Sequence, residues 1–423
     1  MFSMLLLVGY LLIIVLMAVQ SLFNLRLRLF IWGDAEYAAL NRSPKVFVPP
    51  AVSFTVLLPA RHEEAVIGDT IEKVCQSHYP RHLLQVIVIC EQGDHGTIAA
   101  VQQKLDEPGK EHVTLIVFND GPINKPHGLN KGLQAATNDV VTIFDAEDEM
   151  HADIFQIVNT LMVQEDPDVV QSGVRLMNYA STWFSAMNVL EYFFWFKSTM
   201  YYFAWAGVVP LGGNTVFIKR HLLENLGGWD EQCLTEDADV GIRLSVEGAR
   251  VRVVCDDKHV TREETPLSVH ALIKQRTRWN QGFLQVLLKR DWLRYPCLTQ
   301  RILAAYLLIV PFLQAAFAVM LPVSVAMILF VKLPVWISVF TFLPLYVFAL
   351  QICSDLVGLT EFLRAHKQRL SIRVLFAMTL GAFPFQWLMA YAALRAVIRH
   401  VQRRTNWEKT AHLGVHRKMQ NAA

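Results

Sequence analysis

The chain has 423 residues, of which 53% are apolar and only 18% are charged, so an ordinary soluble protein is excluded and part of the chain is expected to lie in lipid. The formal net charge of +2 gives no reason to expect a nucleic-acid partner. Six cysteines are scattered, with no CxxC pair and no His/Cys spacing that is typical of zinc, and we expect them to be reduced and mostly buried.

The first apolar run, residues 2–19, is about as long as one bilayer crossing and is followed at once by RLRLF. A cleaved signal peptide is the alternative interpretation. It is disfavoured because the basic residues follow the apolar run and no small-residue cleavage site is evident. We therefore expect residues 1–25 to form a transmembrane helix, with the N-terminus outside and Arg26 and Arg28 in the cytoplasm.

Residues 50–300 alternate short β-rich runs with polar, helix-like stretches. The runs are FTVLLPA, LLQVIVIC, VTLIVF and DVVTIFDAED. This alternation predicts an α/β domain with a mostly parallel sheet. In such sheets the chemistry gathers where the strands end, so the residues directly after these runs are the candidates for a site.

Within this domain, residues 183–209 are crowded with Trp, Phe and Tyr. A lysine and a glutamate in the segment disfavour a full crossing. We expect a helix that lies on the membrane face, in preference to a helix internal to the core.

Residues 301–397 carry three apolar segments, at 303–330, 334–357 and 374–395, and a basic tail follows at 398–423. A cytoplasmic domain followed by three crossings leaves this tail outside, whereas its charge favours the inside. A re-entrant or interfacial segment would remove the conflict, and places for such a break are Pro311, Pro322 and Pro384. The sequence leaves the question open.

Three carboxylates, Asp145, Glu147 and Asp148, follow the strand-like VVTIF. Isolated acidic clusters are often no more than solvated turns. Carboxylates at alternating positions past a buried strand can, however, reach one divalent cation together, and Mg²⁺ takes one or two carboxylates plus diphosphate oxygens. The pattern favours a metal site here.

A second acidic cluster, which includes Glu236, Asp237 and Asp239, follows Thr235 in LTEDADVG. The same residues suit any helix N-terminus, because a threonine can cap it and carboxylates oppose the dipole. Near a metal-binding cluster, one of these carboxylates would also make a good general base for a hydroxyl. The residues alone leave both interpretations open.

The stretch QRTRWNQGFLQVLLKRDW predicts an amphipathic, interfacial helix at about 275–292, since apolar residues recur four, seven and eight positions after Trp279. Gln275, Arg278 and Trp279 share one helix face. Arginine suits a diphosphate, and tryptophan offers a flat surface to a sugar ring. A basic residue snorkelling beside an interfacial tryptophan explains the residue types, but not their coincidence with two acidic clusters.

These three elements, in this order and ahead of a hydrophobic C-terminal third, resemble the family 2 membrane glycosyltransferases, the group of bacterial cellulose, chitin and hyaluronan synthases. The family pattern of D, DxD, TED and QxxRW is matched by Asp145 with Glu147, by Thr235-Glu236-Asp237, and by Gln275 with Arg278 and Trp279. The stretches LLPARHEEAVIGDTI, NKPHGLNKGL and PLGGNTVFIKR resemble further family segments.

Two positions depart from the family pattern. A strand that normally ends in a pair of aspartates, which read the nucleotide base, offers Cys90 and Glu91 instead, and this puts base recognition in doubt. The metal pair reads Asp-Ala-Glu rather than Asp-x-Asp, a change that keeps an oxygen ligand.

The resemblance implies a GT-A type nucleotide-sugar-binding domain in the cytoplasm, on a small helical bundle in a bacterial inner membrane. It assigns donor binding to Glu91, Lys125, Asp145, Gln275 and Arg278, and a Mg²⁺ or Mn²⁺ ion to Asp145 with Glu147. It assigns catalysis to Asp237 and Glu236, with Asp237 taking the acceptor proton during inversion to a β-linkage, and acceptor binding to Trp279, Gly213 and Asn214.

Three functions are compatible with these residues. The leading one is elongation of a β-linked polysaccharide from a nucleotide sugar, expected to be a UDP-sugar, with export partners or a homo-oligomer completing the pathway. The second is transfer of one sugar to a lipid acceptor, which the small bundle favours and QxxRW disfavours. The third is a membrane scaffold or receptor with a vestigial transferase domain, which the intact acidic clusters oppose.

Overall fold

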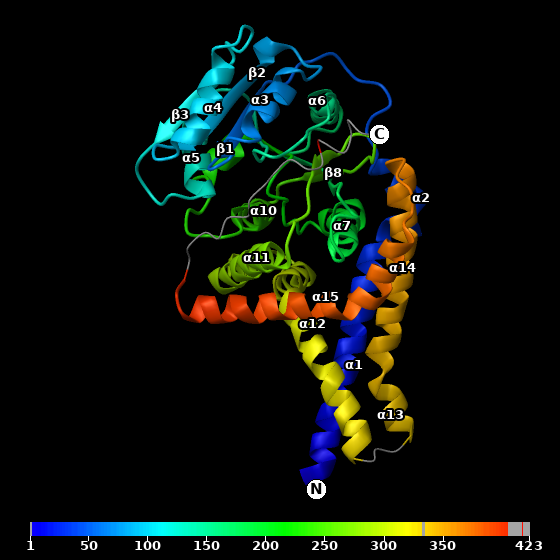
Figure 1. Cartoon of the computed structure of the whole chain (residues 1–423). Coiled ribbons are helices and arrows are strands. Elements are labelled where there is room, and N and C mark those ends of the chain that lie inside the picture. Colours follow the sequence, from blue (N-terminus) through cyan, green and yellow to red (C-terminus); the bar gives the residue numbers. More distant parts are fainter. Residues whose placement is uncertain (1, 332–334, 405–416, 418–423) are drawn as a thin grey trace.

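The computed structural model describes residues 2–331, 335–404 and Arg417. An α/β domain sits at one end of a group of long helices, and the N-terminus lies at the opposite end of that group (Figure 1).

The α/β domain is built on a seven-stranded sheet with the order β3-β2-β1-β4-β7-β5-β8. Its neighbouring strands are parallel, except that β7 runs antiparallel to both β4 and β5. Strands β6 and β9 form a separate parallel pair. The bounds are β1 Phe54–Ala60, β2 Leu84–Glu91, β3 Val113–Phe118, β4 Val140–Ile143, β5 Val169–Ser172, β6 Val174–Leu176, β7 Val216–Lys219, β8 Val251–Val254 and β9 Thr261–Glu263. The predicted α/β domain with a mostly parallel sheet is confirmed.

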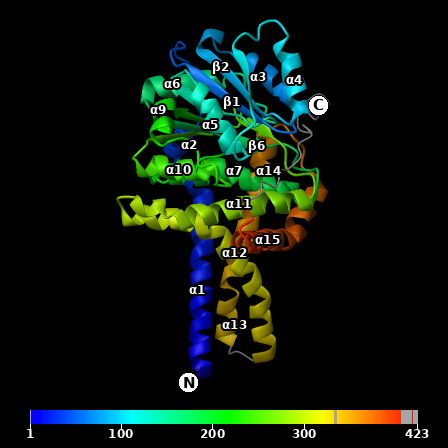
Figure 2. The ribbon, with the colours of Figure 1, turned by 90° about the vertical axis from the view of Figure 1, so that its left-hand side faces the viewer.

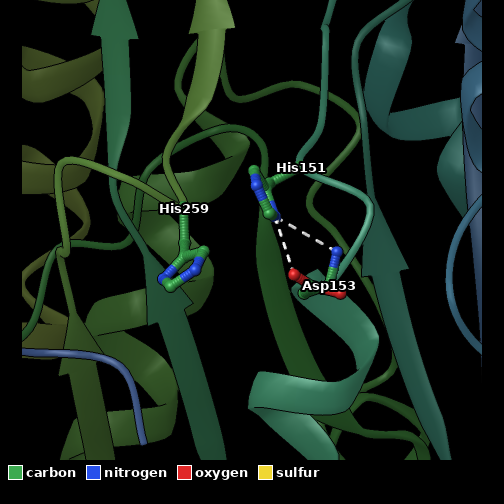
Figure 3. Close-up of side chains that lie close together, drawn as sticks. All are labelled: His151, Asp153 and His259. Atoms are coloured by element: carbon green, nitrogen blue, oxygen red, sulfur yellow. Dashed lines mark hydrogen bonds and ion pairs between the residues drawn. The ribbon is translucent and has the colours of Figure 1, made fainter. Parts of the chain in front are cut away.

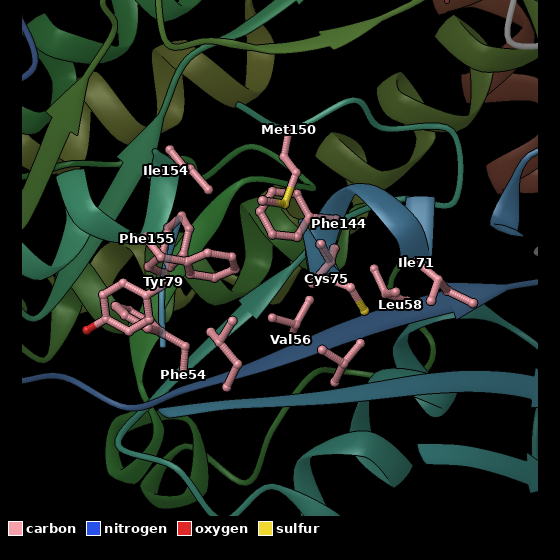
Figure 4. Close-up of a cluster of buried hydrophobic side chains, with 14 of the residues drawn as sticks. Phe54, Val56, Leu58, Ile71, Cys75, Tyr79, Phe144, Met150, Ile154 and Phe155 are labelled. Carbon is pink, nitrogen blue, oxygen red and sulfur yellow. The ribbon is translucent and has the colours of Figure 1, made fainter. Parts of the chain in front are cut away.

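The sheet is buried on both faces, which is why its strands read as unbroken apolar runs. Figure 4 shows Phe54, Val56 and Leu58 of β1 on one face with Phe155. The intervening Leu57 packs on the other face, in a second cluster with Leu129. Helices of this domain are α2 Ala35–Leu40, α3 Ile67–Cys75, α4 His95–Leu105, α5 Lys125–Ala135, α6 Ile154–Glu165, α9 Arg220–Asn225 and α10 Glu236–Val246.

The aromatic segment at 183–209 differs from the expected helix on the membrane face. It forms α7 (Ser185–Phe194), a π-helical turn (Trp195–Thr199) and α8 (Met200–Trp205). Most of its side chains are buried, and α7 packs against α14 (Leu343–Ala365) and α15 (Ile372–Val401). The correction has a simple cause: helices from the C-terminal third cover the aromatic rings, so protein takes the place that lipid was expected to fill.

Among the described residues, four helical segments are long and apolar enough to cross a membrane. Three of them lie along one direction in both views: α1 (Phe2–Leu29), α12 (Leu298–Val331) and α14, which short α13 (Val335–Thr341) precedes (Figures 1 and 2). Most of α15 lies across this direction, below α11 (Val269–Lys289). Pro384 lies inside α15, and proline is a residue that bends helices.

Helix α15 has the surface of an interfacial helix. Its exposed apolar side chains recur every three, four or seven residues, at Ile372, Phe376, Leu380, Trp387, Tyr391, Leu394 and Ile398. Its other side packs against α11 and α12. Helix α11 is therefore covered by α15 on one side, and its expected position at the membrane surface stays a prediction.

We propose that α15 is interfacial, which leaves three crossings and returns the chain to the side of the α/β domain. Consistent with this, Arg417 donates to Thr70 Oγ1 at 2.7 Å and to the carbonyl oxygen of Asp148 at 3.0 Å. This arrangement would remove the conflict between the basic tail and three C-terminal crossings, because only α12 and α14 of that region run along the direction of α1 (Figures 1 and 2).

Candidate active site

A cavity of about 490 Å³ opens at the carboxyl ends of β1, β2 and β4 and reaches the membrane helices. Its lining includes every residue selected from the sequence: Glu91, Lys125, Asp145, Glu147, Gly213, Asn214, Glu236, Asp237, Gln275, Arg278 and Trp279. These residues span almost 190 positions of the chain. The sheet brings them together because β1, β2 and β4 end at one edge, and antiparallel β7 begins there.

The carboxylates after β4 point in different directions. Asp148 is buried and accepts hydrogen bonds from the backbone N–H of Asp145 at 2.8 Å and from Asn214 Nδ2 at 2.9 Å. Asp145 and Glu147 line the cavity. Asp148 therefore fixes the turn from inside, and Asp145 and Glu147 are the carboxylates of this turn that face the cavity.

Glu263, at the end of β9, was not selected from the sequence. Its carboxylate accepts from the side-chain amide of Asn214, which also binds Asp148. Burial, followed by the charges of Glu147 and Asp145, raises the pKa of Glu263 to about 7. Asn214 thus holds the buried Asp148 and the half-buried Glu263 in place, a different task from the acceptor contact expected of it.

Asp145 and Glu147 fit a divalent cation. Both supply hard oxygen ligands, and together with Glu263 they crowd negative charge into one corner of the cavity. A cation there would relieve the repulsion that contributes to the raised pKa of Glu263.

Lys125 is the first residue of α5, and its ammonium lies between the two acidic motifs. It donates to Asp145 Oδ1 at 2.5 Å and to the carbonyl oxygen of Gly213 at 3.0 Å, and lies 3.7 Å from Glu236 Oε1. Although burial opposes the charged form, Asp145 and Glu236 raise the pKa of Lys125. Lys125 therefore stays charged and is placed to meet an anionic ligand.

Asp237 lies in the first turn of α10 and contacts the cavity. Its Oδ1 accepts from the backbone N–H of Ala238 at 2.8 Å. Burial raises its pKa, while the Ala238 N–H and the charges of Lys125 and Arg278 oppose this rise. Burial also raises the pKa of the neighbouring Glu236, to about 7. A buried carboxylate of raised pKa beside a cation suits a proton acceptor.

A side chain at position 213 would crowd Asp237. A Cβ atom there would lie 3.2 Å from Asp237 Oδ2 and 3.7 Å from Lys125 Nζ. The predicted role of Gly213 at an acceptor is compatible with this geometry, since the missing side chain leaves the carboxylate oxygen open toward the cavity.

Helices α11 and α10 approach each other closely, which brings the QxxRW residues of α11 near Glu236 and Asp237 at the start of α10. A Cβ atom at Gly282 would lie 2.4 Å from Thr235 Oγ1, so α11 can pack against the start of α10 only with glycine there. Gln275, Arg278 and Trp279, one to two turns earlier in α11, then face the cavity. Arg278 lies near enough to lower the pKa of both Glu236 and Asp237.

Trp279 belongs to a group of side chains that the sequence did not reveal. The guanidinium of Arg276 lies 4.5 Å from the centre of its ring, and Tyr192 lies 6.1 Å away at an interplanar angle of 42°. Arg276 is held in turn by Asn188 at 2.5 Å and by Glu191. One ring face of Trp279 is thus backed by protein, which makes the indole a rigid wall.

The cavity continues beyond this wall to the membrane helices, where Val310, Pro311 and Gln314 of α12 and Met389 of α15 line it. At the other end, Glu91 closes β2, and its Oε1 accepts from the backbone N–H of Gly93 at 2.7 Å. The site is therefore one cavity with a charged end and an end bordered by the bundle.

Comparison with known proteins shows the class of enzyme. Residues 49–282 match the family described as glycosyltransferase like family 2. The chain belongs to this family. The expected enzyme class, a glycosyltransferase, is confirmed.

Three curated relatives differ in how much of this chain they match. The probable glycosyltransferase YdaM of Bacillus subtilis is 28% identical over 243 residues, 57% of each chain. A poly-β-1,6-N-acetyl-D-glucosamine synthase of Staphylococcus aureus is 27% identical over 256 residues, 59% of each. A β-monoglucosyldiacylglycerol synthase of Synechocystis is 26% identical over 377 residues, 86% of this chain and 75% of that protein. The chain thus spans little more than half the length of the first relative.

A solved structure with the same fold is the mannosyltransferase PcManGT from Pyrobaculum calidifontis, determined with GDP-mannose and Mn²⁺. Its TM-score is 0.54 at 17% identity, and the match covers 92% of this chain and 99% of that one. The similarity shows a GT-A-like fold, as the sequence predicts.

Proposed function

We propose that this glycosyltransferase moves one sugar from a nucleotide sugar to a hydroxyl of a membrane lipid, with inversion at the anomeric carbon. The observation that carries the proposal is the single cavity that joins the carboxylates and Lys125 to residues of α12 and α15. A water-soluble donor enters at the charged end. A lipid acceptor reaches the same cavity from the bundle, with its hydroxyl toward Asp237.

The charged end supports donor binding. Lys125 and Arg278 offer positive charge to a diphosphate, with Gln275 beside them, and Glu91 lies at the end of β2 where a base would sit. Asp145 and Glu147 would hold a Mg²⁺ or Mn²⁺ ion, which supplies charge neutralisation to the diphosphate and its leaving oxygen. On binding, Lys125 exchanges part of its contact with Asp145 for phosphate oxygens.

Asp237 is the proposed base. Its carboxylate takes the proton from the acceptor hydroxyl as that oxygen attacks the anomeric carbon, and the bond to the diphosphate breaks on the opposite side. Glu236 stays beside Lys125 and keeps that ammonium in place. Arg278 stabilises the charge that builds on the leaving diphosphate. Trp279, backed by Arg276, holds the acceptor end.

A lipid acceptor is favoured over a polymer by the number of crossings. Four helical segments among the described residues are long and apolar enough to cross a membrane, which is a small number from which to build a channel for a sugar chain in one copy. The relative that matches the largest share of this chain among the three above is named for a glucosyldiacylglycerol product. A lipid alcohol such as diacylglycerol is therefore the first acceptor to test.

Polysaccharide synthesis remains the second candidate because one relative is named a poly-N-acetyl-glucosamine synthase and because the Trp279–Tyr192 pair offers stacking surfaces. This alternative requires a second copy or an export partner. For either function, the positive-inside rule supports a cytoplasmic α/β domain, since Arg26 and Arg28 end α1 on that side.

The test uses full-length protein in lipid nanodiscs with UDP- and GDP-sugars that carry a label, in Mg²⁺ or Mn²⁺, with and without diacylglycerol. Label that partitions into the organic phase as a single-sugar lipid, together with nucleoside diphosphate release, is the expected result. A labelled product that lengthens with time would replace the lipid proposal with polymer synthesis. Asp237→Asn is the control for background hydrolysis.

A further inference from the structure

A second group of metal-ligating side chains lies outside the cavity. His151, Asp153 and His259 each offer one ligand atom, and these atoms all lie within 4.8 Å of one another. Figure 3 shows the three side chains side by side, on the turn that leads into α6 and on the loop between β8 and β9. None of the three lines the cavity.

The side chains are oriented toward one another. Nδ1 of His151 accepts from the backbone N–H of Asp153 at 3.1 Å and lies 3.7 Å from Asp153 Oδ2, so the ring is held beside the carboxylate, and a cation bound at this nitrogen would take the place of the N–H hydrogen bond. The rings of His151 and His259 are 4.8 Å apart at 77°. Ligands of a tetrahedral zinc ion with bonds of about 2.1 Å are about 3.4 Å apart. The longest separation must therefore shorten by up to about 1.4 Å, within reach of partly exposed side chains.

Further polar groups already orient two of these residues. His78 Nδ1 donates to Asp153 Oδ1 at 2.7 Å, which leaves Oδ2 on the side of His151. His259 Nδ1 lies 2.9 Å from Ser43 Oγ, and donation from Nδ1 to this hydroxyl leaves the lone pair on Nε2. Such outer contacts are what metal-binding histidines and carboxylates usually have.

We propose that His151, Asp153 and His259 bind a zinc-class divalent cation, with water in the fourth position. Two imidazoles with one carboxylate favour Zn²⁺ over Mg²⁺, which prefers oxygen ligands. The site would therefore take a different ion from the one proposed for Asp145 and Glu147.

The location gives such an ion a consequence for the active site, and this part alone rests on the proposed function. His151 lies six residues after Asp145, and His259 four before Glu263. Glu149 of the first segment and Arg262 of the second exchange two backbone hydrogen bonds of 3.0 Å, which hold the two segments together. A cation bound to the two histidines would cross-link the same two segments at a point outside the cavity. It would thereby restrict the movement of the cavity carboxylates that these segments carry.

The test is Zn²⁺ titration of untagged, chelator-treated full chain in nanodiscs, against a competing chromophoric chelator. We expect one equivalent to bind, and binding to weaken at least tenfold in His151→Gln/His259→Gln. His221→Gln, at an exposed histidine of α9, should bind as wild type does. Asp145→Ala/Glu147→Ala should also keep the zinc, because the two sites are separate.

Two results would overturn the proposal: unchanged binding in the double histidine variant, or loss of zinc binding in the Asp145/Glu147 variant. Absence of binding by wild type would do the same. Thermal unfolding distinguishes a folding defect: without zinc the double variant His151→Gln/His259→Gln should melt as wild type does, and zinc should raise Tm by about 2–4 °C in wild type but not in that variant. No transfer activity is needed, so failure here is separate from failure of the proposed function.

Discussion

The two ends of the cavity are built in different ways. The charged end is built from strand ends and the short segments beside them. Glu91 is the last residue of β2, Asp145 and Glu147 follow β4, and Gly213 precedes β7. The membrane end is lined by long helices, with Val310, Pro311 and Gln314 from α12 and Met389 from α15.

Because of this difference, we assign catalysis and donor binding to the charged end and entry of the acceptor to the membrane end. Strand ends are fixed by backbone pairing, so carboxylates and Lys125 are held at distances of 2.5 to 3.7 Å. The helix-lined end depends on the packing of apolar side chains, which determines the shape of the cavity but does not orient polar groups toward a ligand. Substitutions at the charged end should therefore affect rate and donor binding, whereas those at the membrane end should affect the acceptor.

The largest effect is expected for Asp237→Asn, which removes the proposed base and keeps the size of the side chain. Transfer should fall by about 10²–10⁴-fold, with donor affinity nearly unchanged. Initial rates and isothermal titration with the donor measure the two quantities. Transfer at the wild-type rate would show that another group takes the proton.

Asp145→Ala should reduce metal-dependent donor affinity by about 10- to 100-fold, since a charged contact contributes about 1.5–3 kcal/mol. The measurement is donor binding with and without Mn²⁺. Asp148→Asn is an informative companion, because it keeps a polar side chain beside Asn214 and should cost stability more than donor affinity. Equal donor affinity of Asp145→Ala with and without the ion would remove the metal role.

The pH dependence of transfer should report the buried carboxylates. Burial raises the pKa of Asp237, and a base must be ionised, so activity should be lost as pH falls through a midpoint above about 4, the ordinary value for aspartate. Lys125 lowers the pKa of both Glu236 and Asp237. Lys125→Met should therefore move this acid limb upward by about 1–3 pH units, besides lowering the rate. An acid limb that does not move would mean that the titrating group lies elsewhere.

Trp279→Ala should slow transfer to the acceptor by about 3- to 10-fold, the worth of an aromatic contact of 0.5–1.5 kcal/mol, and should leave hydrolysis of the donor by water less affected. The two reactions are measured in parallel. Losses of equal size in both would assign Trp279 to the donor.

The smallest effect is expected at the membrane end. Gln314→Ala removes one polar side chain from the lining on α12 and should raise the acceptor KM by about 2- to 10-fold, with the donor KM unchanged. Thr379→Ala, an exposed position of α15 that is absent from the lining, is a matched control. A rise in the donor KM with no change in the acceptor KM would reverse the assignment of the two ends.

The charged end could be predicted from the sequence because its residues follow recognisable strands and keep a fixed spacing within one motif. Gln275, Arg278 and Trp279 share a helix face, so their common direction follows from helix geometry alone. Arg276 could not be foreseen as the partner of Trp279, since that contact depends on Asn188 and Glu191, far away in the chain.

The membrane end and the group of His151, Asp153 and His259 could not be predicted either, because both depend on contacts between segments that are far apart in the chain. Length and apolar composition do not distinguish α15 from a crossing helix, since its direction is set by contact with α11 and α12. The aromatic rings of α7 were assigned to lipid because the helices that cover them come from the C-terminal third. His78, His151 and His259 are 73 and 108 residues apart, so no local spacing marks them.

The central claim is that a lipid acceptor reaches Asp237 from the side of α12 and α15, and photocrosslinking tests it most directly. Asp237→Asn protein in nanodiscs is mixed with the donor and with a lipid alcohol that carries a diazirine near its hydroxyl, then irradiated and mapped by mass spectrometry. The account predicts crosslinks to residues 310–314 and around 389, which unmodified lipid competes away. Crosslinks confined to the outer faces of α1 and α14, without competition, would contradict it.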